Sequence, residues 1–482
     1  MIFESKDNIN HLSFQLLYKG KSDGLAIKKA TENLVDRGFL PALQTLLDKY
    51  SPAGSLLTID KIVCDIHVNE REFNEAVAGK IIAELEKQLI EKGNSPDGGI
   101  TSVSGEARFV EILFFYLKNG FMPWYANISS RAQLNELLAA SIEQGIPEES
   151  IRALIQLLRL DAVILRICND FDEPLIWAFI ALLIGSKGKK VLDTWRDDYE
   201  VIISAIHTTI GTRVITQSYK KSLLKSIADY GAAGSAQAMT AINLFFAKLF
   251  ATEFVSEIKS PEIVEQLIAA RSTTRLRNEV LAEQLKTVSK PDVPNTVDGD
   301  KPRIEMKTNP DEIPKKPSEE PIYVNNSGLV IVAPYLNMFF KRMEVVADNK
   351  IINHSKAITL LHYIATAKET FAEFEVVLPK LLCGFEPDFA IPAPYEITPD
   401  DIELVDEMLK AVISNWTILK NTSVAGLREA FLLREGKLTF MAEGSRLKVQ
   451  RNSIDVLLDQ IPWNISMIKL PWMTNLLTVD WL

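Results

Sequence analysis

The chain has 482 residues, of which 47% are hydrophobic and 24% are charged. This length and balance predict two to four folded domains, and they exclude a mini-protein, a wholly disordered chain and a membrane-embedded chain. The 63 Asp and Glu residues outnumber the 53 Lys and Arg residues and give a net charge of -10. The chain therefore lacks the basic footprint of a general nucleic-acid binder, and nucleic acid is not an expected partner.

Cysteine usage and the first ten residues predict a protein that is made and folded in the cytoplasm. The cysteines lie too far apart for a disulfide framework or a zinc site, at Cys64, Cys168 and Cys383. Residues 1–10 carry charged side chains where a signal peptide needs an apolar stretch. The apolar run of residues 175–184 is about half as long as a spanning helix. We expect a buried core helix there and no stable membrane insertion, with membrane contact as the alternative.

Residues 1–93 are predicted to form a small α+β module. Apolar and polar side chains alternate over residues 12–18 and 57–68, as they do in half-buried strands. Helices are expected over residues 23–36, 41–50 and 70–92. Gly38 is interpreted as the residue that ends the first helix, and Pro41 as the residue that opens the second.

Two segments of contrasting composition follow a turn-rich connector at residues 94–105. Residues 106–286 keep a helical apolar period almost throughout, which predicts a bundle of roughly eight helices. Residues 287–321 hold seven of the chain's 22 prolines among polar side chains. Such a stretch buries too little apolar surface to offset its ordering entropy, so a flexible linker is predicted there.

Residues 322–482 are predicted to form an α+β domain. A strand containing a turn is expected over residues 322–333, and helices at 335–346, 354–367, 375–382, 399–416 and 424–434. A hairpin of residues 437–440 and 446–450 follows, with Arg446 and Lys448 on its wet face. A short helix at 453–460 and an extended run at 463–470 complete the domain. The fold class predicted for the whole chain is mainly α, with small β elements near both termini.

The sequence lacks the common motifs of catalysis and cofactor binding. It contains no phosphate loop, no nucleophile elbow, no H-E-x-x-H zinc motif and no G-x-G-x-x-G dinucleotide motif. His354 and His362 are two helical turns apart, too far to hold one ion, so a core or cap role is favoured. Cys64 and His67 fall on opposite faces of their predicted strand. We therefore expect no catalytic, cofactor-binding or metal-binding residue, and no enzymatic activity.

Two clusters of carboxylates precede apolar helical runs. They are Asp170, Asp172 and Glu173 before Pro174, and Asp400 with Asp401 after Pro399. The first cluster lacks the glycine and the downstream glutamate of a calcium loop. Carboxylates stabilise the first turn of a helix through its dipole, so both clusters are predicted to start helices.

Tryptophan is concentrated near the C-terminal end of the sequence. Four of the seven tryptophans fall there, at Trp416, Trp463, Trp472 and Trp481. Tryptophan is enriched where binding energy concentrates, so a terminal cluster is a candidate assembly surface. Packing in a core is the alternative, and it is favoured for Trp416. The candidate partner-binding residues are Trp463, Lys469, Trp472, Met473 and Trp481.

Long and distinctive motifs are dense between residues 322 and 482. They are residues 361–366 (LHYIAT), 377–384 (VLPKLLCG), Trp416 with 419–423 (LKNTS), 427–438 (LREAFLLREGKL), 459–463 (DQIPW) and 466–473 (SMIKLPWM). These motifs resemble those of the tape measure proteins of extracellular, phage-tail-like contractile injection systems. Residues 121–125 (FMPWY) and 55–92 resemble the same family more loosely.

The resemblance implies a structural assembly factor that sets the length of the inner tube, and with it the sheath, of a contractile injection particle. The implied partners are the inner tube protein, the baseplate or spike proteins and a tube cap. The implied locations are the cytoplasm during assembly and the tube lumen of the released particle. Rod-like tape measures are usually poor in glycine and proline, whereas this chain has 22 of each. The alternatives are a folded baseplate-hub or assembly-chaperone component, and a cargo effector.

Overall fold

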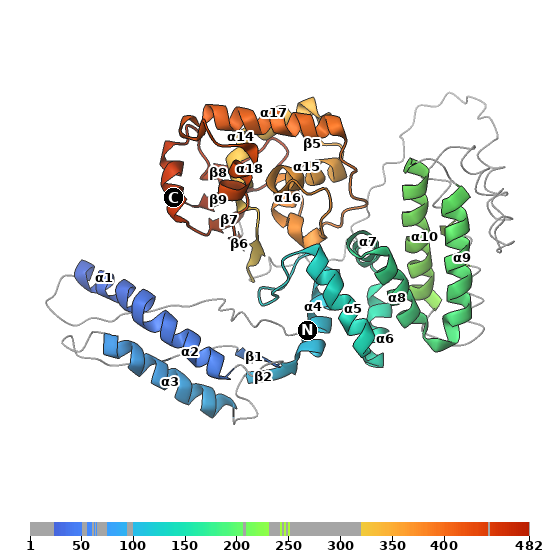
Figure 1. Ribbon diagram of the computed structural model, residues 1–482, viewed down its shortest axis with the longest axis horizontal. Coiled ribbons are helices and arrows are strands. Elements are labelled where there is room, and N and C mark those ends of the chain that lie inside the picture. The colour runs from blue at the N-terminus through green and yellow to red at the C-terminus, as the bar shows by residue number, and fades with distance from the viewer. Residues whose placement is uncertain are drawn as a thin grey trace. The chain divides into compact units, whose positions relative to one another are not determined.

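The computed structural model describes residues 24–50, 55–59, 62, 64, 75–93, 100–205, 209–230, 242, 245–246, 249–250, 320–441 and 444–481. The fold is mainly α with small β elements, as the sequence predicts (Figure 1). The chain divides into two compact units, Met1–Ile112 with Trp124–Asn127 and Leu113–Pro123 with Ile128–Leu482. The predicted strand at residues 12–18 and the predicted linker up to residue 319 lie outside the described residues.

The first unit contains an unbroken helical run. Helix α1 (Gly24–Leu34) continues through the π-helical turn η1 (Val35–Phe39) into α2 (Leu40–Tyr50). The prediction that Gly38 ends a helix is wrong. A Cβ atom on Gly38 would lie 3.2 Å from the Cβ atom of Ala78 on α3 (Glu75–Gly93), so this glycine allows α3 to pack closely. Pro41, which has no N–H group, follows the π-helical turn, where the helix bonds are already irregular.

A two-stranded antiparallel sheet belongs to the same unit. Strand β1 (Ser55–Ile59) pairs with β2 (Ile100–Ser104) in a register that sets Leu57 opposite Ser102. Of the predicted strand at residues 57–68, residues 57–59 lie in β1, and Ile62 and Cys64 lie outside any strand. The prediction of a connector at 94–105 is wrong for β2, because five of its residues pair with β1. Pro96, Gly98 and Gly99 precede the strand in the sequence and Gly105 follows it, so none of them stands among the paired residues.

Helices make up the first half of the second unit. They are α4 (Gly105–Asn119, shared with the first unit), α5 (Arg131–Gln144), α6 (Glu148–Leu157), α7 (Asp161–Asp170), α8 (Glu173–Ile184), α9 (Lys189–Ala205) and α10 (Thr209–Tyr230). The prediction of a buried core helix at 175–184 is confirmed, because Ile176, Phe179 and Ile180 of α8 are at most 1% exposed. Within the described residues, no helix is both long and apolar enough to cross a membrane.

A five-stranded sheet forms part of the C-terminal segment, which we define as residues 320–481. Its order is β3 (Ile322–Val324), β6 (Gly436–Met441), β7 (Gly444–Val449), β9 (Leu476–Asp480) and β8 (Met467–Ile468). The predicted hairpin is confirmed as the antiparallel pair β6–β7, in which Leu447 is buried and Arg446 is exposed. Strand β9 was not predicted, and it runs parallel to β7.

The prediction of a strand over residues 322–333 is wrong beyond residue 324. The chain continues as the 3₁₀ helix η5 (Ser327–Val332), every residue of which is buried. A run of buried apolar residues has no alternation that distinguishes a strand from a helix, and the tertiary contacts decide between them. Here a Cβ atom on Gly328 would lie 1.8 Å from the carbonyl oxygen of Phe431, so η5 passes directly against this neighbouring backbone.

The remaining helices of the C-terminal segment enclose one core. They are α14 (Ala333–Arg342), α15 (His354–Thr366), the 3₁₀ helix η6 (Glu373–Val376), α16 (Val377–Leu382), α17 (Pro399–Asn415), the 3₁₀ helix η7 (Thr417–Leu419), α18 (Val424–Leu427), the π-helical turn η8 (Arg428–Leu432) and the 3₁₀ helix η9 (Ser453–Gln460). Trp416 is fully buried in this core, as favoured from the sequence. The prediction that Asp400 and Asp401 start a helix is confirmed, because Asp401 forms a capping box with Thr398.

Candidate functional site

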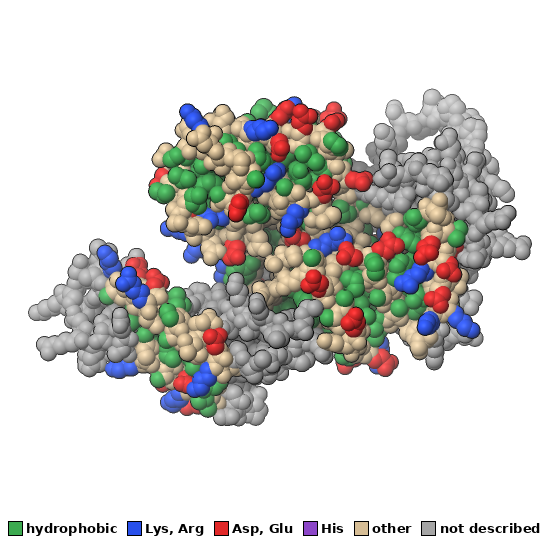
Figure 2. Space-filling model, viewed as in Figure 1, with side chains coloured by type: hydrophobic (Ala, Val, Ile, Leu, Met, Phe, Trp, Pro, Cys, Tyr) green, Lys and Arg blue, Asp and Glu red, His purple; other side chains and the backbone are tan. Residues whose placement is uncertain are grey.

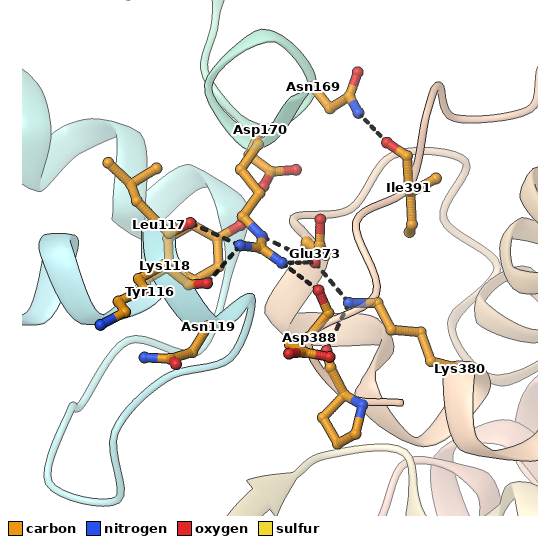
Figure 3. Close-up of polar contacts among 12 residues, drawn as sticks. Tyr116, Leu117, Lys118, Asn119, Asn169, Asp170, Glu373, Lys380, Asp388 and Ile391 are labelled. Carbon is orange, nitrogen blue, oxygen red and sulfur yellow. Dashed lines mark hydrogen bonds and ion pairs between the residues drawn. The ribbon is translucent and has the colours of Figure 1, made fainter. Parts of the chain in front are cut away.

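A buried arginine connects helices α4 and α7 to the C-terminal segment. Figure 3 labels its partners Leu117, Lys118, Glu373 and Asp388. Arg166 of α7 is 0% exposed and uses its whole guanidinium group. Its Nη1 atom donates to the carbonyl oxygens of Leu117 (2.7 Å) and Lys118 (3.0 Å) at the end of α4. Its Nε and Nη2 atoms point the other way, to Glu373 Oε1 at 3.0 Å and to the carbonyl oxygen of Asp388 at 2.6 Å.

A second buried cation shares the same carboxylate. Lys380 of α16 is 0% exposed, and its Nζ atom donates to Glu373 Oε1 at 2.7 Å and to the carbonyl oxygen of Pro387 at 3.0 Å. Burial lowers the pKa of Lys380, and the charge of Glu373 opposes that effect. Glu373 therefore holds two buried cations, and no other charged side chain in the described residues is within ion-pair distance of either one.

An acid and a phenol lie beside this group. Tyr116 of α4 donates its hydroxyl hydrogen to Asp170 at the end of α7, and both side chains are buried. The pKa of Asp170 is raised to about 7, first by burial and then by the negative charge of Glu373, while hydrogen bonds from Tyr116 and the Glu373 backbone and the charge of Arg131 limit the rise. The prediction that Asp170 starts a helix is wrong, because it ends α7. Asp172 and Glu173 do stand at the start of α8, at its N-cap and in its first turn.

Two further hydrogen bonds lie beside these charged groups. Asn169 Nδ2 donates to the carbonyl oxygen of Ile391 at 2.8 Å, and the backbone N–H of Arg131 donates to Glu375 Oε2 at 3.2 Å. Gly120 completes the enclosure with a φ of 76°. A Cβ atom there would lie 2.3 Å from Glu373 Oε1, so only glycine fits the turn after α4. We call the contact formed by Tyr116, Arg166, Asp170, Glu373 and Lys380 the joint.

The joint contains charges that the surface does not reveal. On the visible face of the described residues, acidic, basic and hydrophobic side chains are interspersed (Figure 2). In the joint, by contrast, the charged side chains are buried and have almost no contact with solvent. The cations of the joint donate to carbonyl oxygens and to the carboxylate of Glu373, and Tyr116 donates to Asp170. These bonds fix the geometry of two chain segments and provide no set of ligands for a metal. Within the described residues, no group of three or more His, Cys, Asp or Glu side chains has a metal-binding arrangement.

Sequence reasoning missed the joint, although a weak signal was present. Arg166 stands inside the apolar run of residues 163–167, and Lys380 stands inside the apolar run of residues 377–382. A lone cation in a buried helical run needs a buried partner, because an isolated charge is too costly to remove from water. The partner could not be named from the sequence, since Glu373 lies 207 positions from Arg166.

The candidate partner-binding residues all have partners within the chain. Trp481 is 2% exposed and donates from Nε1 to Asp455 Oδ2 at 3.1 Å. Trp463 and Trp472 are half-buried, and their Nε1 atoms donate to the carbonyl oxygens of Ile331 (3.0 Å) and Leu382 (2.8 Å). Met473 is buried, whereas Lys469 is exposed and donates to a carbonyl oxygen nearby. Their role in binding a partner stays a prediction.

The titratable groups singled out from the sequence lie apart from one another. His354 packs against Phe385 and Phe389, whereas His362 is buried against Phe371. Burial lowers the pKa of His362 to about 4, so this side chain is neutral at pH 7. Cys383 is buried, which raises its pKa and makes the thiol unreactive. His67 lies outside the described residues.

The pH dependence of stability is expected to report the state of Asp170. Its pKa is about 7 in the folded chain and about 3.8 in the unfolded chain, so the folded chain holds this proton more tightly. The stabilisation that protonated Asp170 gives to the folded chain is therefore fully present below pH 4. It is lost as the pH rises towards 7, at up to about 1.4 kcal/mol of unfolding free energy per pH unit. Asp170→Asn keeps an acceptor for Tyr116 and should flatten this part of the profile in urea unfolding between pH 4 and 8. Equal slopes for both proteins would contradict the assignment.

The fold is that of a mainly helical protein, and the joint is a buried polar cluster that holds two of its chain segments together. The family model for contractile injection system tape measure proteins matches residues 6–481, nearly the whole chain. The chain therefore belongs to the contractile injection system tape measure protein family, which is a family of structural proteins. No curated protein and no solved structure matches the chain significantly.

Proposed function

We propose that this chain sets the length of the inner tube, and with it the sheath, of a contractile injection particle. The observation that carries the proposal is the family match over residues 6–481. The predicted division supports it, with a central helical part at 106–286 between an α+β module at 1–93 and, after a linker at 287–321, a C-terminal domain at 322–482. In this role the chain acts structurally and catalyses no reaction.

The length of the central part limits what a single helical chain can measure. At a rise of about 1.5 Å per residue, residues 106–286 would span roughly 270 Å as one helix, and the whole chain roughly 720 Å. An extended helix exposes the apolar faces that the compact fold buries, at a cost of about 25 cal/mol per Å². The tube wall or parallel copies of the chain must cover those faces.

The proposed partners follow from this requirement. The inner tube protein would cover the extended part, and the baseplate or spike proteins and a tube cap would bind the ends. The candidate surface for one of these contacts is the C-terminal stretch with Trp463, Lys469 and Trp472. The proposed locations are the cytoplasm during assembly and the lumen of the tube afterwards.

A folded assembly chaperone or baseplate-hub component is the second candidate function. The observation that favours it is the joint, which ties α4 and α7 to the C-terminal segment through buried charges. A protein that works in this compact form has no need to extend. If the chain has this function, particles should keep their length when the central part of the chain is shortened.

Deleting residues 251–286 is expected to shorten the tube by roughly 54 Å. The deletion removes 36 residues, or about ten helical turns, which preserves the helical phase. It also leaves every described residue in place. Electron microscopy of assembled particles measures the result.

Duplicating the same residues is the matched control and should lengthen the tube by the same amount. Particles of normal length from both variants, or no particles from either one, would exclude a role of this chain in setting the tube length. That outcome would favour the chaperone or baseplate-hub function.

A further inference from the structure

Several polar contacts cross the joint. Arg166 bonds to Glu373 and to the carbonyl oxygen of Asp388, and Asn169 bonds to the carbonyl oxygen of Ile391. The backbone N–H of Arg131 bonds to the carboxylate of Glu375. Two apolar contacts accompany them: the edge-to-face ring pair of Tyr116 with Phe374, at 5.5 Å between centroids, and the packing of Phe121 against the core of the C-terminal segment. Polar contacts of this kind are typical of interfaces between parts that separate without unfolding.

The interiors on the two sides of the joint differ from the joint itself, because both are apolar. In the C-terminal segment, the side chains of Leu360, Leu361 and Ile364 on α15 are 0% exposed in an apolar core. On the helical side, Ile164 and Ile167 of α7 are also 0% exposed. Exposing either core costs free energy in proportion to its apolar area. Opening the joint exposes charged side chains to water. The hydration free energy that they regain offsets much of the ion-pairing energy that is lost.

We propose that the joint is a latch: it holds α4 and α7 against the C-terminal segment in one geometry, and it opens as a unit while both sides stay folded. The single carboxylate of Glu373 is its centre, because it compensates both Arg166 and Lys380. The hydrogen bonds give the closed form its geometry, and their modest net free energy makes it reversible. The latch stands on these contacts and does not require the length-setting role.

Hydrogen–deuterium exchange of the full chain tests the latch. The amide of Arg131 donates across the joint and reports its opening, whereas the amides of α15 report the C-terminal core. In the wild-type chain at low urea, the peptide that contains Arg131 should exchange at least about tenfold faster than the α15 peptides. The peptides of α10 should stay protected with those of α15.

Glu373→Gln provides the second measurement, because it leaves two buried cations without a counter-charge. Glu373 makes no described hydrogen bond to Arg131, so a change at the Arg131 amide reports the opening of the joint and not the loss of a direct contact. Amide exchange at Arg131 should become faster by a factor on the order of 100. Exchange in α10 and α15 should change less than about twofold. Glu369→Gln removes the same charge from an exposed position and is the matched control.

Each outcome decides the proposal. Faster exchange confined to the joint supports the latch. Equal acceleration in α10, α15 and Arg131 would show that the joint belongs to one cooperative core and would overturn it. Unchanged exchange at Arg131 in Glu373→Gln would also overturn it, because Glu373 would then not hold the contact closed. If the variant fails to fold, the wild-type measurement in urea still separates these outcomes.

Discussion

Gly328→Ala is expected to destabilise the C-terminal segment by more than about 3 kcal/mol, the upper end of the range for over-packing. A Cβ atom at this position would lie 1.8 Å from the carbonyl oxygen of Phe431 and 2.6 Å from the Cα atom of Leu432. Both neighbours are backbone atoms, so no side-chain rotation relieves the overlap. The 3₁₀ helix η5 and the π-helical turn η8 would have to separate, although Leu329 and Val330 next to Gly328 are fully buried.

Urea unfolding followed by tryptophan fluorescence measures this effect, since four of the seven tryptophans lie in the C-terminal segment. Gly426→Ala is the matched control. Its Cβ atom would meet only side-chain atoms, at 3.1 Å from Thr422 and 3.4 Å from Ser423, and it lies in helix α18. A helical glycine replaced by alanine changes stability by at most about 1 kcal/mol. Similar midpoints for both variants would mean that η5 and η8 are not packed as described.

Trp481→Ala is expected to lower the free energy of unfolding by about 3–5 kcal/mol, the usual cost of removing a buried aromatic side chain. Trp481 is 2% exposed, and its Nε1 atom donates to Asp455, which also pairs with Arg434. The substitution therefore creates a cavity and removes one hydrogen bond from Asp455. Urea unfolding of the full chain measures the loss.

Trp481→Phe is the companion variant, because it keeps most of the ring packing and removes the N–H donor. Its expected cost is about 1–2 kcal/mol. The pair also tests the partner-binding prediction for Trp481. If Trp481→Ala unfolds the chain as much as expected, this side chain acts through folding. If the chain stays stable and assembly into particles is lost, the side chain binds a partner.

Local patterns in the sequence predicted several elements of the C-terminal segment. Asp400 and Asp401 after Pro399 predict the start of α17, because carboxylates stabilise the first turn of a helix through its dipole. Alternation around Arg446 and Lys448 predicts β7 with one wet face, because side chains alternate in any strand. The apolar run at 175–184 predicts the buried helix α8, because its length excludes a membrane span.

Elements that depend on distant partners escaped prediction. Strand β2 lies in a turn-rich stretch with Pro96, Gly98 and Gly99 just before it, and it forms because β1, 41 to 49 positions earlier, pairs with it. Strand β9 forms because β7 is available on its flank. Gly38 was expected to end a helix, but the approach of Ala78 explains the glycine. In each case, a contact between separate elements outweighs the local preference of the residues.

The sequence by itself determined the mainly α composition, the start of α17 and the family, because these depend on residue types at short spacing or on contiguous motifs. Only the tertiary structure decided the joint, in which Arg166 meets a carboxylate 207 positions away. It also decided that Asp170 is buried and does not start a helix. A charge inside an apolar run indicates that a partner exists. Which residue supplies that partner depends on how the folded segments meet, and this is a property of no local stretch of the chain.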